Sequence, residues 1–135
     1  MPTAHITVTL NKSMINPFLI NVMTLSTRRA AYKVRDRARA FAPVKTGSLR
    51  RNIRVEESGR STPDQVSMNV NANRFYASWQ EHGYPYRIYP KRAKFLRFIP
   101  KGKNYFVFAK STRGIPPVHY MKRARDSVTL ADFTK

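Results

Sequence analysis

The stretch PFLINVMTLSTRRAAYKVRDRARAF, residues 17–41, decides the fold, because its apolar residues recur every three or four positions. On a helix these positions form one stripe: Ile20, Met23, Thr27, Ala30, Val34, Ala38 and Phe41. Pro17 suits a first helical turn, and Pro43 disfavours helical geometry at the residue before it. We therefore predict one helix over residues 17–42, roughly 37 Å long at about 1.5 Å per residue.

A short strand and a turn are predicted before this helix, in residues 1–16. Ile6, Val8 and Leu10 alternate with threonines, which is typical of a strand with one buried face. Asn16 can cap the helix that follows.

An antiparallel sheet is predicted after the helix, within residues 49–110. The segments Leu49–Val55 and Gln65–Val70 have apolar residues at strand spacing, with a turn over 57–64. Arg51 interrupts the first apolar face, which leaves open whether that strand begins at Leu49 or at Asn52.

Three further elements are predicted toward the C-terminus. Phe75–Glu81 reads as a short strand or a helical turn. The apolar runs Phe95–Ile99 and Tyr105–Ala109 are joined by a Gly-containing link, which indicates a basic hairpin. Residues 118–133 read as a C-terminal helix. Residues 1–135 are then one α+β domain, an antiparallel β-sheet packed by a long N-terminal helix and a shorter C-terminal helix.

The charge of the chain is its unusual property. The 135 residues include 26 Lys and Arg against 7 Asp and Glu, a formal net charge of +19. Such a surplus repels itself, so it indicates a polyanion or an acidic protein as partner. The chain has no cysteine, which excludes a disulfide scaffold and any thiolate metal site. We expect no signal peptide and no contact with a membrane.

Two groups of basic residues are candidates for contact with DNA or a partner protein. Arg29, Lys33 and Arg37 are four residues apart on the predicted long helix, where they either track phosphates or form a solvated face. Lys101 and Lys103 flank the glycine at the tip of the predicted hairpin. Lysine also blocks edge-to-edge pairing of strands, so this second group has a structural alternative as well.

A cluster of aromatic residues in the middle of the chain is the candidate subunit interface. Tyr and Trp are enriched at protein interfaces. A platform for base stacking would instead have arginines between the aromatic residues on a sheet. The alternative is local core packing. The candidate residues are Phe75, Tyr76, Trp79, Tyr84 and Tyr86.

Catalytic chemistry finds little support in the sequence. No nucleophile, phosphate-binding or zinc-protease motif is present, and no pair of acids has a convincing acid–base or metal spacing. The adjacent Glu81 and His82 are interpreted as a polar loop pair. We therefore predict that the chain is not an enzyme, with no catalytic residue, no metal and no cofactor.

Four blocks of the sequence resemble a known family. Residues 42–53 (APVKTGSLRRNI) are similar to its AP-x-x-TG-x-LR-x-x-I block, and residues 76–83 (YASWQEHG) to its YA-x-x-x-E-x-G block. Residues 91–98 (KRAKFLRF) resemble its K-x-A-x-x-L-x-F strand. Residues 116–124 (PPVHYMKRA) resemble its closing P-x-P helix, with Val118 in place of the second proline. The family is the tail-component family of tailed bacteriophages, of the minor tail protein Z and tail-completion type.

The resemblance implies a structural protein of the virion, assembled in the host cytoplasm. It implies a homo-oligomeric ring, of six subunits, that completes the tail at the neck and joins it to the head connector. The partners would be other phage neck and tail proteins, together with packaged DNA through non-specific phosphate contacts. Four residues would shape turns of the fold, namely Pro43, Thr46, Gly47 and Gly83.

Two other functions remain open on composition alone. One is a free basic nucleic-acid-binding protein, which would bind RNA or DNA tightly and in a salt-dependent way as a monomer. The other is a small ribonuclease toxin, which would use basic residues, Tyr or His119 on a sheet. Expression of such a toxin would arrest growth.

Overall fold

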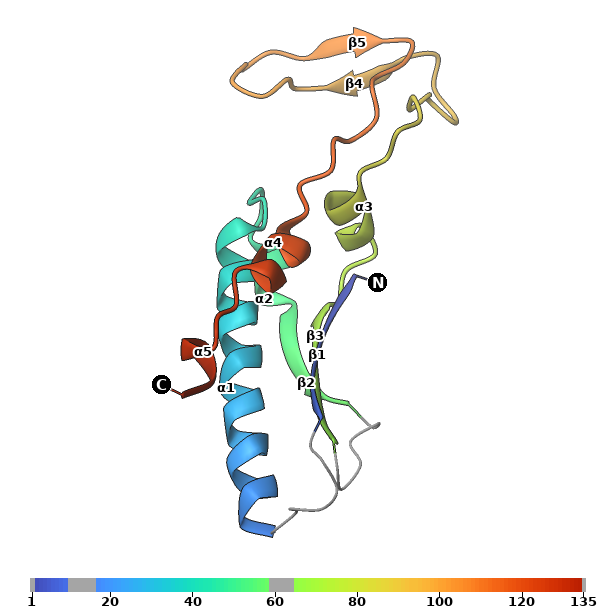
Figure 1. Cartoon of the computed structure of the whole chain (residues 1–135). Helices are drawn as coiled ribbons and strands as arrows, with labels where there is room; N and C mark the ends of the chain where they lie inside the picture. Colours follow the sequence, from blue (N-terminus) through green and yellow to red (C-terminus); the bar gives the residue numbers. More distant parts are fainter. Residues whose placement is uncertain (1, 10–16, 59–64, 135) are drawn as a thin grey trace.

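The computed structural model describes residues 2–9, 17–58 and 65–134 of the chain (Figure 1). The predicted strand residue Leu10, the cap Asn16 and most of the turn predicted over 57–64 lie outside these residues. The described part is an α+β fold, as the sequence predicts.

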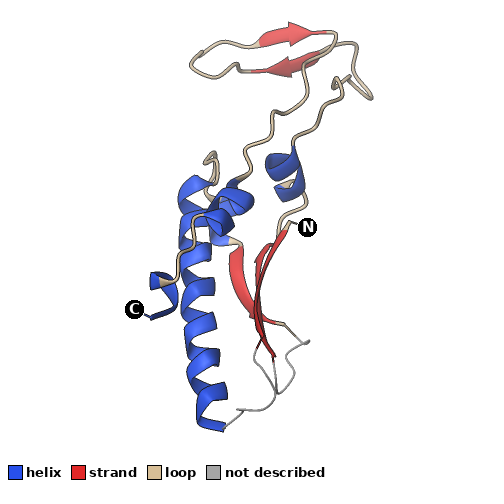
Figure 2. Cartoon of the chain, viewed as in Figure 1, coloured by secondary structure: helices blue, strands red, loops and turns tan. Residues whose placement is uncertain are grey.

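The body of the molecule is a three-stranded antiparallel sheet with a long helix along one face (Figures 1 and 2). The strands are β1 (Thr3–Thr9), β2 (Ile53–Glu57) and β3 (Gln65–Ala72), with β3 in the centre. Because side chains alternate along a strand, every second residue of β3 turns toward the helix. These residues are buried and form the core of the sheet: Val66, Met68, Val70 and Ala72.

The helix α1 (Pro17–Phe41) supplies the other half of the core. Ala31, Val34 and Ala38 pack on the sheet, and all three are completely buried. The small alanines allow the helix backbone to approach the sheet closely. The prediction of a long amphipathic helix ending near Pro43 is confirmed.

The structure resolves two alternatives that the sequence left open and corrects one prediction. Leu49–Arg51 belongs to a one-turn helix, α2 (Ser48–Arg51), because a left-handed Gly47 turns the chain before strand β2 begins. The alternative over Phe75–Glu81 is resolved in favour of a helix, α3 (Ala77–His82). The predicted C-terminal helix is divided into α4 (Tyr120–Asp126) and α5 (Ala131–Thr134), which both pack on α1.

The predicted hairpin forms, but it is not part of the main sheet. Strands β4 (Leu96–Phe98) and β5 (Val107–Ala109) pair only with each other within the described chain. They stand beyond α3 and α4, at the end of the molecule opposite the start of α1 (Figure 1). We call residues 84–115, which carry this hairpin, the arm.

None of the helices that the structure describes is both long enough and apolar enough to span a membrane.

Candidate interaction surfaces

The arm is anchored where α3 meets α4, and Glu81 holds these two helices together. Its side chain is 4% exposed, and its carboxylate accepts the backbone N–H groups of Met121 at 2.8 Å and Lys122 at 2.9 Å. These N–H groups lie in the first turn of α4, where backbone N–H groups have no acceptor within the helix. The prediction that Glu81 and His82 form a polar loop pair is wrong, because Glu81 is a buried cap of helix α4.

Tyr120, the first residue of α4, completes this junction. Its ring is completely buried, and its hydroxyl lies 3.5 Å from the carbonyl oxygen of Ala77 in α3. Burial raises the pKa of Tyr120 well above its usual range, and the nearby Glu81 carboxylate adds to the effect. The side chain is therefore a neutral packing residue.

Two glycines permit the close approach of the two segments of the chain that meet at the base of the arm. Gly83 has a φ of +78°, and a Cβ there would lie 2.8 Å from the carbonyl oxygen of Ile115. A Cβ on Gly114 would lie only 1.7 Å from the carbonyl oxygen of Tyr84. Tyr84 and Ile115 exchange two backbone hydrogen bonds here, at 2.7 and 2.9 Å.

The arm is a long antiparallel ribbon closed by a tight turn. Ile88 and Thr112 exchange a second pair of backbone hydrogen bonds, both of 3.0 Å, before β4 and β5 begin. At the tip, Lys103 donates its backbone N–H to the carbonyl of Pro100 at 3.1 Å, and Gly102 has a φ of +79°. Lys101 and Lys103 flank this glycine and are exposed.

Both faces of the arm carry large apolar side chains. Arg97 pairs with Phe108 across the ribbon, so these two share one face. The Arg97 guanidinium also lies 3.7 Å from the centre of the Phe106 ring, on that same face. Phe98, which pairs with Val107, is on the other face. Phe108 is 65% exposed, Phe106 50% and Phe98 36%.

The aromatic residues predicted to form an interface are brought together beside the base of the arm. Their rings contact one another in series, with centroid separations of 5.2 to 6.1 Å. Phe75 is 82% exposed, Tyr86 71% and Trp79 44%, so much of this aromatic row faces solvent in the single chain. The row consists of Tyr76, Phe75, Trp79, Tyr84 and Tyr86 in order of contact.

The five basic candidates do not form one site. Arg29 and Lys33 are exposed on α1, and no carboxylate among the described residues pairs with either. Lys101 and Lys103 are at the tip of the arm, well away from α1 (Figure 1).

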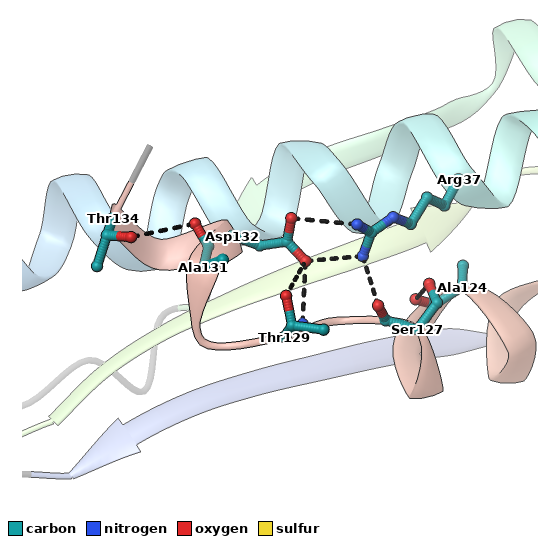
Figure 3. A network of polar contacts seen from close by, with 7 residues as sticks. All are labelled: Arg37, Ala124, Ser127, Thr129, Ala131, Asp132 and Thr134. Atoms are coloured by element: carbon teal, nitrogen blue, oxygen red, sulfur yellow. Dashed lines mark hydrogen bonds and ion pairs between the residues drawn. The ribbon is translucent and has the colours of Figure 1, made fainter.

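Arg37 differs from Arg29 and Lys33, the other basic residues of its stripe, because its guanidinium already binds groups of this chain (Figure 3). It binds Asp132 through two hydrogen bonds, of 2.8 and 3.1 Å, and donates a third, of 2.7 Å, to the carbonyl of Ser127. Arg37 thus fastens the C-terminal segment to α1. This role removes it from the set of cations that are available to DNA or a partner.

The attachment of α5 should depend on pH. A hydrogen bond from the Thr129 backbone N–H lowers the pKa of Asp132 below its ordinary value of 3.8, and the hydrogen bonds from Arg37 add to the effect. A carboxyl with a lowered pKa stabilises the folded state above its unfolded pKa and loses this contribution as the pH falls. We therefore expect amide exchange at the C-terminal segment to accelerate as the pH falls below 3.8.

Hydrogen exchange across that range, corrected for intrinsic rates, measures this effect. The Asp132→Asn variant is the control, and its exchange should be fast already at neutral pH, without a step at acid pH. Equal protection of the wild-type segment at pH 3 and pH 7 would contradict the prediction.

The turn-shaping candidates lie in two places. Gly47 has a φ of +72° and precedes α2, and the Thr46 hydroxyl lies 3.4 Å from the backbone nitrogen of Ser48. Pro43 follows Ala42, a buried residue directly after α1. Gly83 is the glycine at the base of the arm.

Two features of these surfaces are not among the predictions from the sequence. The role of Glu81 depends on N–H groups that are about forty residues away, so no local signal marks it. The two apolar faces of the arm do have a local signal, since FLRFI (95–99) and YFVFA (105–109) lack the polar alternation of a half-buried strand. Among the described residues, no three His, Asp or Glu side chains gather as ligands of a metal ion.

Comparison with known proteins supports one family. Residues 25–83 match the model of a family described as "Bacteriophage HK97-gp10, putative tail-component". The match extends from the middle of α1 to Gly83, and so ends where the arm begins. It contains the blocks at 42–53 and 76–83, whereas the blocks at 91–98 and 116–124 lie outside it. No curated protein and no solved structure matches the chain.

The match confirms the resemblance to a tail-component family of tailed phages. It supports a structural protein of the phage tail, located in the virion, whose neighbours are other tail proteins.

Proposed function

We propose that this chain is a non-enzymatic, ring-forming subunit at the head-proximal end of a phage tail, where it completes the tail and joins it to the head. The family match carries the proposal, because it runs without a break from within α1 through α2, β2, β3 and α3. The proposed ring number, six, comes from the resemblance to tail-completion proteins.

The distribution of uncharged apolar surface supports a ring. The first ten residues of α1 carry no charge, and four of them are exposed large apolar residues: Phe18 (70%), Leu19 (41%), Val22 (43%) and Leu25 (51%). The aromatic row is a second such surface, on a different part of the chain. Contact between two different surfaces of identical subunits is heterologous, and it closes a ring when the rotation per subunit allows.

The exposed cations of α1 have a place in such a ring. Arg29 and Lys33 would line the lumen and hold packaged DNA through its phosphates, without reading its sequence. Tight binding by the free monomer is not required for this role.

The first test is the mass of the purified protein in solution, at low and high salt, with and without duplex DNA. A ring-sized oligomer is the expected result. A monomer that binds no nucleic acid at physiological salt also agrees with the proposal, if rings form only on a tail. A stable monomer with tight RNA binding would favour the free nucleic-acid-binding protein, which the net charge of +19 keeps as the alternative.

Removal of the two α1 cations should reduce infectivity without affecting the fold. We expect the Arg29→Gln/Lys33→Gln double variant to change the free energy of unfolding by less than about 0.5 kcal/mol, because both side chains are exposed. Phage complemented with it should give fewer infectious particles. The matched control is Lys45→Gln/Lys122→Gln, which removes the same charge from exposed positions outside the predicted stripe. Equal titres for the two variants would contradict the lumen assignment.

A further inference from the structure

The arm has the composition of a surface that is buried in the assembled particle. Neither face of β4 or β5 is packed extensively against another described helix or strand. An isolated two-stranded ribbon is only marginally stable in water unless something packs on it. Phe108 and Phe106 on one face and Phe98 on the other are exposed in the single chain. A protein surface that covers these rings would supply the missing contacts.

The charge of the arm restricts what that protein can be. Residues 84–115 contain nine Lys and Arg and no Asp or Glu. A second copy of the arm, or any other basic surface, would repel it. The partner must therefore offer carboxylates around its apolar surface.

The described residues of a second copy of this chain are a poor source of them, because their acidic side chains already have partners and the copy carries the same net charge of +19. The side chains of Asp36, Asp126 and Asp132 bind arginines, as does that of Glu57, which is held by Arg28. Glu56 accepts a hydrogen bond of 2.6 Å from Asn71, and Glu81 caps α4. The seventh acid of the chain, Asp64, lies outside the described residues.

Duplex DNA would satisfy the lysines but not the phenylalanines. Phosphate contacts need cations, and the bases of a duplex are stacked and unavailable to rings on both faces of a ribbon. A protein with an apolar groove satisfies both kinds of side chain.

We propose that the arm docks into a different protein, in a groove with apolar walls and an acidic rim. Phe98, Phe106 and Phe108 fill the groove, and the lysines of the tip pair with the rim. The inference rests on the proposed function only for the location of this partner, which is a neighbouring protein of the neck or tail. The aromatic row at the base of the arm and the exposed apolar residues in the first turns of α1 remain for contacts between copies of this chain.

The test is site-specific photo-crosslinking by the full-length protein within particles. Phe108→p-benzoylphenylalanine places the photoreactive ring on an exposed face of the arm, so the fold should tolerate it. The variant complements a phage whose own copy of the gene carries a stop codon, and purified particles are irradiated. The control is Tyr32→p-benzoylphenylalanine, an aromatic position on α1 that is 43% exposed. An immunoblot establishes that the protein is in the particles.

We expect position 108 to crosslink to a single, different virion protein, at a peptide that contains both apolar residues and Asp or Glu. Position 32 should not give that product. Crosslinks from position 108 to a second copy of this chain, or to DNA, would overturn the inference and leave the proposed function intact. Absence of crosslinks from position 108, with the protein present in the particles, would overturn it as well. Absence of the protein from the particles would overturn both.

A second variant tests the role of charge. Adding Lys101→Gln and Lys103→Gln to the photoreactive protein should lower the yield of the crosslinked product several-fold, because rim charges steer association. An unchanged yield would overturn the claim that the groove has an acidic rim.

Discussion

Replacement of Glu81 with alanine should lower the free energy of unfolding by about 3 kcal/mol, because one buried and one partly buried N–H group of α4 lose a charged acceptor. Each hydrogen bond to a charged group contributes about 1.5–3 kcal/mol, and the variant also escapes the cost of burying a carboxylate, so the two contributions do not add in full. The expected decrease in Tm is on the order of 10 °C for a domain of this size. Thermal unfolding followed by circular dichroism measures it.

Two controls make this result specific. Glu81→Gln keeps the volume and one good acceptor, so it should lose about half as much stability. Glu56→Ala removes an exposed acid of the same type, whose hydrogen-bond partner is Asn71, and should change stability by less than about 0.5 kcal/mol. A Glu81→Ala protein that melts close to the wild type would show that Glu81 does not join α3 to α4.

Gly114→Ala should separate the two segments of the chain that pair at the base of the arm, while the body of the molecule stays folded. The added methyl group would lie 1.7 Å from the carbonyl oxygen of Tyr84 and 2.8 Å from that of Tyr86, and backbone atoms cannot give way locally. The two hydrogen bonds between Tyr84 and Ile115 must therefore break. A local loss of about 2–3 kcal/mol corresponds to amide exchange that is roughly 30- to 160-fold faster.

Native-state hydrogen exchange at the amides of Tyr84, Ile88, Thr112 and Ile115 measures this effect. The amides of β3 should keep their protection, because the core of the body is not in contact with Gly114. Gly102→Ala is the matched control within the same arm, since a Cβ there meets no atom within 4 Å. Its effect should be confined to the tip, where a φ of +79° makes alanine strained. Unchanged exchange at Tyr84 and Ile115 in Gly114→Ala would contradict the prediction.

Local signals in the sequence account for most of the elements. The period of three to four residues over 17–41, with Pro43 after it, predicts α1 correctly because an amphipathic helix needs only its own periodicity and a stop. The Gly-containing link at 100–104 likewise predicts the hairpin of β4 and β5, since a tight turn between apolar runs is a local property. The blocks at 42–53 and 76–83 point to the tail-component family that the comparison supports.

Contacts between residues distant in the sequence decided the rest. Arg29, Lys33 and Arg37 are equivalent as a sequence pattern, but only Arg37 meets Asp132, a residue that folds back from the C-terminus to bind it. The Arg37–Asp132 ion pair and the hydrogen bond from Arg37 to the Ser127 carbonyl lie on either side of the break between α4 and α5. Glu81 is buried because α3 meets α4, and the arm stands apart from the main sheet because none of its strands pairs with β1, β2 or β3. Periodicity and turns are properties of neighbouring residues, and net charge is a sum over the chain, so the sequence by itself determined them. The partner of each charged group and the exposure of each apolar face depend on which segments the tertiary structure brings together.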